Sequence, residues 1–106
     1  MDNLLALRFQ ALGAPTRFAV VEALLDGPAA VSDLAAPHKM ALPSFTKHLG
    51  VLERAGLIES EKRGRVRTCR LNPAALDELH GWFADRRALW GRRLDRLDRH
   101  LRETKE

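Results

Sequence analysis

The spacing of apolar residues changes at Gly56, and this change constrains the fold more than any other feature of the chain. Before Gly56, apolar residues recur at intervals of three and four, which predicts a helix with one buried stripe. After it the period is about two, which predicts strands at residues 58–62 and 66–71. The predicted stripe consists of Leu42, Phe45, Leu49 and Leu52. A helix followed by a β-hairpin is therefore expected, with Gly56 in the left-handed conformation that ends many helices.

Pro43 suits the first turn of the predicted helix, because a proline there lacks only an N–H that would have no partner. Ala41 stands where a capping side chain is usual, and the loss of such a cap costs about 1 kcal/mol. The face opposite the apolar stripe carries groups that can reach base edges and phosphates. These residues are Pro43, Ser44, Thr46, Lys47, His48 and Arg54.

The hairpin is expected to turn across residues 63–65, where Gly64 supplies the positive φ of a tight turn. Four cations then lie at or near its tip: Lys62, Arg63, Arg65 and Arg67. Like charges at an exposed tip repel unless an anion lies nearby, and phosphate is the obvious anion. Residues 39–70 carry eight Lys or Arg against three Glu in a chain of net charge +4, so the basicity is local. Either element alone is also compatible with ordinary solvated surface.

The preceding segment completes a helix-turn-helix. A first helix is expected from Leu4 to Gly13, and a second from Pro15 towards Gly27. Ser32 is the predicted N-cap of a short third helix that Pro37 limits, and residues 38–41 form the turn. In a helix-turn-helix the second helix enters the major groove of DNA and the first braces it.

The C-terminal third predicts one helix from residue 73 to about 102, because Asn72 and Pro73 make a cap and first turn. Its apolar residues recur partly at seven-residue intervals, a pattern typical of helix pairing, although His80 and Arg87 interrupt the second row. We hypothesise a homodimer whose interface is formed by this helix together with the first one. The predicted interface residues are Leu5, Phe9, Leu76, Phe83, Trp90, Leu94, Leu97 and Leu101. The alternative is that the helix folds back on its own core.

Length and composition indicate one domain spanning residues 1–106, with helices and wing in 1–72 and the dimerisation helix in 73–106. The fold class is mainly α with a β-hairpin. No apolar run approaches a membrane span and no secretory signal is visible, so a cytoplasmic protein is expected. No catalytic constellation appears at workable spacing, so no enzymatic activity is expected.

Four segments together resemble the ArsR-type winged helix-turn-helix repressors, and the resemblance extends over nearly the whole chain. They are ALGAPTRFAVVEALL, VSDLA, LPSFTKHLGVLERAGLI and RGRVRTCRLNP. The resemblance implies a homodimer on a pseudo-palindromic operator, with residues 41–48 opening the recognition helix and residues 62–67 forming the wing. It also implies that Pro43, Ser44, Thr46, Lys47 and His48 face the groove.

The chain departs from the metal-sensing members of that family. Residues 31–33 stand where some relatives have a Cys-x-Cys pair. A second set, Asp77, His80, His100 and Glu103, has unusual spacing, with its two histidines about 30 Å apart along a helix. No metal or other cofactor is expected, and a metal-responsive repressor stays an alternative. So does a winged-helix protein-interaction module that does not bind DNA.

Cys69 has two interpretations. Neighbouring Arg67 and Arg70 would lower its pKa and favour redox sensing, whereas a lone cysteine in a strand is usually a packing residue. The sequence identifies no effector, operator or regulated gene.

Overall fold

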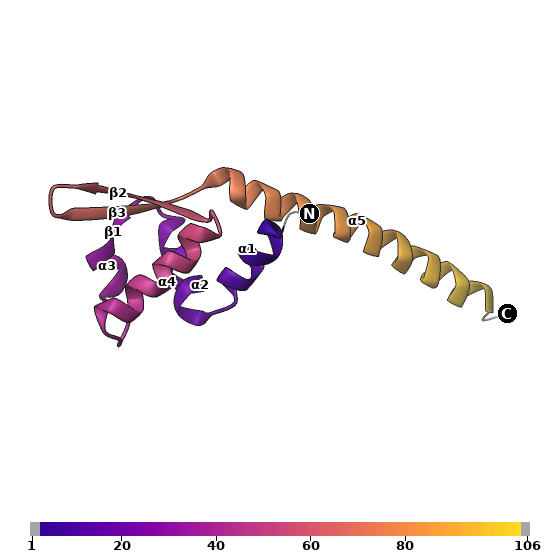
Figure 1. Ribbon diagram of the computed structural model, residues 1–106. Coiled ribbons are helices and arrows are strands. Elements are labelled where there is room, and N and C mark those ends of the chain that lie inside the picture. The colour runs from indigo at the N-terminus through magenta and orange to yellow at the C-terminus, as the bar shows by residue number, and fades with distance from the viewer. Residues whose placement is uncertain (1–2, 105–106) are drawn as a thin grey trace. The chain divides into compact units, whose positions relative to one another are not determined.

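The computed structural model describes residues 3–104 (Figure 1). The chain forms α1 (Leu4–Leu12), α2 (Pro15–Leu24), β1 (Ala29–Ala30), α3 (Val31–Ala35), α4 (Leu42–Arg54), β2 (Ile58–Arg63), β3 (Val66–Leu71) and α5 (Pro73–Thr104). The chain divides into two compact units, residues 1–76 and residues 77–106. The first unit is a winged helix-turn-helix and the second is most of a long helix, which confirms the predicted fold class.

The sheet has three antiparallel strands in the order β1-β3-β2, one more than the sequence predicts. β2 and β3 form the hairpin, which extends away from the helices around it (Figure 1). β1 is only two residues long and pairs Ala29 with Cys69 and Ala30 with Thr68. Two alanines show no alternation of apolar and polar residues, so periodicity cannot detect this strand.

The predicted buried stripe of α4 is confirmed at three of its four positions. Phe45, Leu49 and Leu52 are buried, in a core to which α2 contributes Val20, Val21 and Leu24. Leu42 is 59% exposed, so its assignment to the core is wrong. It is the first residue of α4, and periodicity assumes that neighbouring elements cover the whole length of a stripe, which they do not at this end.

The N-terminal caps of α3 and α4 are both alanines. Ala41 caps α4 without a side-chain hydrogen bond, as the sequence predicts. Ser32 is not the cap of α3, because that helix begins at Val31 after Ala30. Ala30 is extended, with ψ 147°, and pairs with Thr68 of β3. The short strand therefore fixes where the helix begins.

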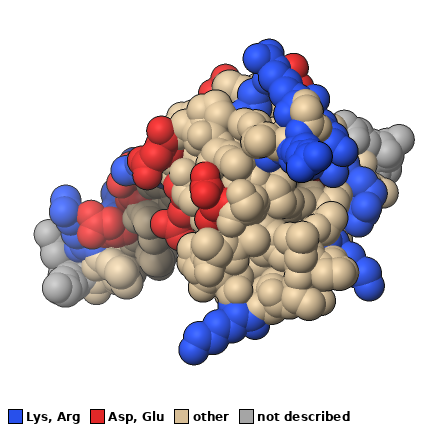
Figure 2. Space-filling view, turned by 90° about the vertical axis from the view of Figure 1, so that its left-hand side faces the viewer, with Lys and Arg blue, Asp and Glu red and all other residues tan. Residues whose placement is uncertain are grey.

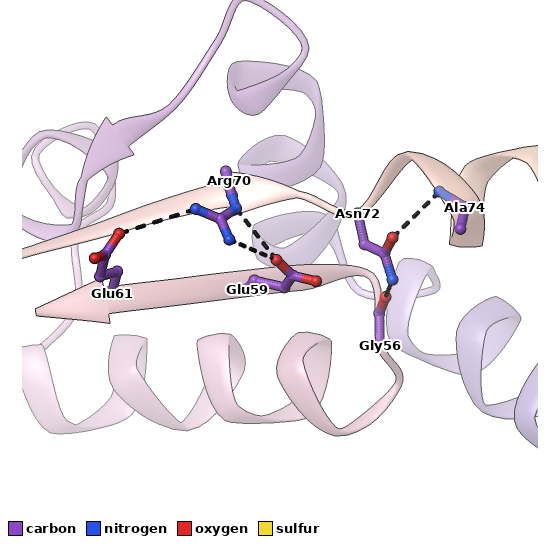
Figure 3. Close-up of polar contacts among 6 residues, drawn as sticks. All are labelled: Gly56, Glu59, Glu61, Arg70, Asn72 and Ala74. Carbon is purple, nitrogen blue, oxygen red and sulfur yellow. Dashed lines mark hydrogen bonds and ion pairs between the residues drawn. The ribbon is translucent and has the colours of Figure 1, made fainter.

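Asn72 joins the end of α4 to the start of α5 (Figure 3). Its Oδ1 accepts a hydrogen bond from the Ala74 N–H at 3.2 Å, which confirms the predicted cap. Its Nδ2 donates to the carbonyl oxygen of Gly56 at 2.9 Å. Gly56 has φ +71°, the left-handed conformation that the sequence predicts for it. One side chain thus holds both the exit from α4 and the entry to α5.

Within residues 3–104, no helix is long and apolar enough to cross a membrane.

Candidate nucleic-acid interface

The outward row of α4 consists of Pro43, Lys47, Gly50 and Arg54, which lie opposite buried Phe45 at about 100° per residue. The side chains of Pro43, Lys47 and Arg54 are exposed, as are those of Ser44 and Thr46 on either side. Short donors and two cations therefore line the surface that a winged helix-turn-helix would turn towards DNA.

A shallow hollow runs along this outer face. Its lining is Leu42, Pro43, Thr46, Lys47, Gly50, Val51 and Arg54. Gly50 contributes no side chain, and the three nearest atoms to a β-carbon built there all belong to the Arg54 guanidinium, with Nη1 at 3.3 Å. Three residues of this lining are not among the site residues predicted from the sequence: Leu42, Gly50 and Val51. Helical projection alone would have found Gly50.

His48, predicted to face the groove, is half-buried and bonded within the protein. Its Nδ1 lies 3.1 Å from Nη1 of Arg17 on α2. The same guanidinium donates from Nε to the carbonyl oxygen of Ala11 at 2.7 Å and from Nη2 to that of Gln10 at 3.3 Å. Arg17 therefore ties the last turn of α1 to the recognition helix. Arg17 lies within the segment ALGAPTRFAVVEALL, but the sequence alone predicts no role for its side chain.

The hairpin has two chemically different faces, because residues directly opposite in an antiparallel pair share a face. One face carries Ile58, Ser60, Lys62, Arg67, Cys69 and Leu71, and the other carries Glu59, Glu61, Arg63, Val66, Thr68 and Arg70. Buried Ile58 and Cys69 identify the first as the core-facing side. The basic residues of the wing are therefore divided between two sides.

On the outer face the cations are paired with carboxylates. Arg70 binds Glu59 at 2.9 Å and lies 3.9 Å from Glu61 (Figure 3). Arg63 binds Glu61 at 3.2 Å. Both arginines are more than half exposed, so each pair contributes little to stability, but it does lower the local positive charge.

On the core-facing side Lys62 lies directly opposite Arg67, and both side chains are exposed. Arg67 lines a second hollow together with Thr46, Gly50 and Glu53 of α4, among others. Arg65 is exposed in the two-residue turn, after Gly64 with φ +61°. Figure 2 shows Lys and Arg side chains gathered over the hairpin. The predicted wing residues thus comprise two cations on the side of α4, one at the turn, and Arg63 on the opposite face.

Cys69 is fully buried in β3. Burial raises the pKa of its thiol, the carboxylate of Glu53 raises it further, and Arg67 acts in the opposite direction. A raised pKa disfavours the reactive thiolate. Of the two interpretations, the structure therefore supports a packing residue.

The apolar residues predicted for the dimer interface differ in exposure. On α5, Phe83, Trp90, Leu94, Leu97 and Leu101 are each more than half exposed. Leu5, Phe9 and Leu76 are half-buried. Across residues 3–104 the structure has no group of three or more His, Cys, Asp and Glu side chains that could hold a metal ion.

These features define the class of protein, a winged helix-turn-helix with a basic, outward-facing recognition helix. A helix-turn-helix domain model matches residues 12–61. Over 71 residues the chain is 39% identical to the HTH-type transcriptional regulator Rv2034 of Mycobacterium tuberculosis, covering 67% of this chain and 66% of that protein. It is 28% identical over 75 residues to the transcriptional repressor SdpR of Bacillus subtilis, covering 71% of this chain and 83% of SdpR.

Solved structures show the same fold. A crystal structure of an ArsR family transcriptional regulator is 47% identical, covers 84% of this chain and 92% of its own, and has a TM-score of 0.79. The homodimeric winged helix-turn-helix domain of Mb0332 from Mycobacterium bovis, solved by NMR, is 24% identical, with a TM-score of 0.62 and coverage of 87% and 82%. The chain belongs to the ArsR family of winged helix-turn-helix transcriptional regulators.

Proposed function

We propose that this regulator is a sequence-specific repressor that binds a pseudo-palindromic operator as a homodimer. In this proposal α4 enters the major groove and the wing lies on the adjacent sugar-phosphate backbone. The observation that best supports the proposal is that the cations of the hairpin are distributed over its two faces. Lys62 and Arg67 lie on the side of the recognition helix, whereas Arg63 and Arg70 are bound to carboxylates on the other side.

The proposal gives the residues different tasks. Lys62, Arg65 and Arg67 bind phosphates, which fixes the position of the protein without reading sequence. Pro43, Ser44, Thr46, Lys47 and His48 lie along the base edges of the major groove, which carry the sequence information. Because Lys62 and Arg67 are like charges directly opposite each other, a bound phosphate would relieve their repulsion.

The dimer is supported by the exposed apolar stripe of α5. Trp90, Leu94, Leu97 and Leu101 follow one another at intervals of four, three and four, which gathers them on one side of the helix. Mb0332, which has the same fold, is homodimeric. A two-fold dimer presents two recognition helices to half-sites about 34 Å apart, one turn of DNA.

Repression is supported by the similarity to SdpR, and it would follow from covering a promoter. We place this DNA-binding regulator in the cytoplasm and assign it no enzymatic role. We also keep the wing and long helix together as one functional domain.

A protein-interaction module would be expected to expose apolar side chains where Ser44, Lys47 and Arg54 stand.

The proposal is tested by selecting bound duplexes from a random pool with the purified protein. We expect enrichment of two inverted half-sites whose centres are separated by about one helical turn. Affinity for the selected duplex should fall steeply as salt rises, because several phosphates release counterions. A pool without enrichment, together with a flat salt response, would instead support the interaction module.

A further inference from the structure

Aliphatic groups flank the basic outward row of α4. Its hollow is walled by the aliphatic groups of Leu42, Pro43, Thr46 and Val51, while the cations Lys47 and Arg54 complete its lining. We propose that this hollow receives the 5-methyl group of a thymine, so that Leu42 and Gly50 determine operator specificity. The inference rests on the proposed function, since it assumes that α4 lies in the major groove.

The chemistry of the major groove identifies the occupant. Among the base edges displayed there, thymine presents a methyl group, and small apolar side chains contact it. One exposed leucine on a protein surface needs no explanation. Leu42, however, is 59% exposed beside three other apolar groups on the surface predicted to bind DNA. If Leu42 contacted only water, a polar side chain would be equally suitable at this position.

Gly50 shapes the floor of the hollow. It lies in the outward row with Lys47 and Arg54, and a β-carbon added there would come within 3.3 Å of the Arg54 guanidinium. Glycine in the interior of a helix is less favourable than alanine. A close approach of the DNA to the helix backbone at this position would explain why a glycine is present there.

The cations at the hollow favour DNA over an apolar peptide. A peptide covering it would remove Lys47 and Arg54 from water without supplying negative charge, whereas phosphates and guanine acceptors suit both. Arg67 reaches the same stretch of α4 from the wing, because it lines a hollow with Thr46 and Gly50. The surface around the methyl site is thus positive on two sides.

The test begins with the operator selected from the random pool. Each thymine in it is replaced singly by deoxyuridine, which removes the methyl group and leaves the hydrogen-bonding edge intact. We expect one position in each half-site at which this change weakens binding about fourfold, the effect of burying one methyl group. Replacing both symmetric thymines should weaken binding about fifteenfold if the half-sites add.

Two variants connect that effect to the hollow. Leu42→Ala removes one wall, and Gly50→Ala partly fills the floor. Each should bind the thymine and deoxyuridine operators equally at the sensitive position. Leu25→Ala is the matched control, because Leu25 is also an exposed leucine, at 65%, but lies outside this surface. It should keep the full discrimination.

The outcomes separate the two proposals. Failure to enrich any duplex overturns the proposed function. An enriched operator that tolerates deoxyuridine everywhere, or lacks thymine in its half-sites, overturns the methyl site and leaves the proposed function intact. Full discrimination retained by both Leu42→Ala and Gly50→Ala also overturns the methyl site. Circular dichroism and urea unfolding show whether the variants are folded.

Discussion

Nη1 of Arg17 and Nδ1 of His48 form a hydrogen bond of 3.1 Å between α2 and α4. A guanidinium can only donate, so Nδ1 of His48 must accept. The neutral imidazole then carries its proton on Nε2, and in the proposed complex this second nitrogen would donate to an acceptor on the DNA. Arg17 of α2 therefore sets the tautomer of His48, a residue of α4 that the proposed function places in the groove.

Arg17→Met should remove the hydrogen bond to His48 together with the two hydrogen bonds to the end of α1. We expect a loss of about 2 kcal/mol in the free energy of unfolding, since hydrogen bonds from charged groups contribute more than neutral ones. Base preference opposite His48 should also relax, because the ring is no longer oriented. Urea unfolding and ¹⁵N NMR of the imidazole measure the two effects.

Arg54→Met is the control for that substitution, because Arg54 is an exposed arginine of α4 that lies away from His48. It should leave the unfolding free energy and the tautomer unchanged. A native protein whose NMR spectrum shows the proton on Nδ1 of His48 would contradict the arrangement.

Gly50→Ala and Gly56→Ala make the same chemical change with opposite expected signs. At Gly50 the backbone is helical, so alanine should raise the unfolding free energy by up to about 1 kcal/mol. At Gly56, with φ +71°, alanine should lower it by about 1–2 kcal/mol because of the left-handed backbone. Its β-carbon would also lie 3.2 Å from Nη2 of Arg8, which is buried and donates from Nε to the Ala55 carbonyl at 3.0 Å. Urea unfolding of both variants decides the signs.

The two faces of the wing should differ in their contribution to the salt dependence of DNA binding. Arg67→Ala should weaken binding to all sequences and reduce the slope of log affinity against log salt by about 0.9, the value for one phosphate. Arg70→Ala, which removes a cation already bound to Glu59, should change the slope little. Equal changes in slope for the two variants would reject the division of the wing.

The sequence predicts most of the fold because long periodic segments report burial directly. Helical spacing identified the core positions Phe45, Leu49 and Leu52, and Gly56 and Gly64 marked two backbone positions that need positive φ. Periodicity failed where an element was too short, as in β1, or where a stripe ran past its neighbours, as at Leu42. The error at Ser32 has the same origin, since β1 determines where α3 begins.

The candidate site could be predicted only in outline. Its location follows from charge and from helical faces, but pairings between distant residues do not. The bond from Arg17 to His48 joins residues 31 positions apart, and no local pattern signals it. The division of the wing depends on strand register, which the two-residue turn fixes. An error of one residue in register would reverse which arginines lie beside α4.

Cys69 should make stability depend on pH in the alkaline range. Burial raises the pKa of its thiol above the ordinary value of 9.0, so the folded state keeps a proton that the unfolded state loses. Below about pH 9 both states are protonated and Cys69 has no effect on the pH dependence. Above it the unfolding free energy should decline, at most by about 1.4 kcal/mol per pH unit, until the folded thiol also ionises.

Urea unfolding at pH 8 and pH 10 measures this decline, and Cys69→Ala should show a smaller one than the native chain. The native thiol should also react slowly with a thiol reagent at neutral pH and rapidly after urea is added. Fast modification of the folded protein would instead support the redox interpretation.

Leu94→Gln should weaken the proposed dimer by placing an amide in the middle of the exposed stripe of α5, where apolar burial would otherwise favour association. We expect the dissociation constant to rise by at least tenfold in sedimentation equilibrium, with a matching loss of affinity for the two-half-site operator. Arg92→Gln is the control, because Arg92 lies on the opposite side of the same helix at about 100° per residue. A native chain that sediments as a monomer at tens of micromolar would remove the dimer, and the binding of both half-sites would then need another explanation.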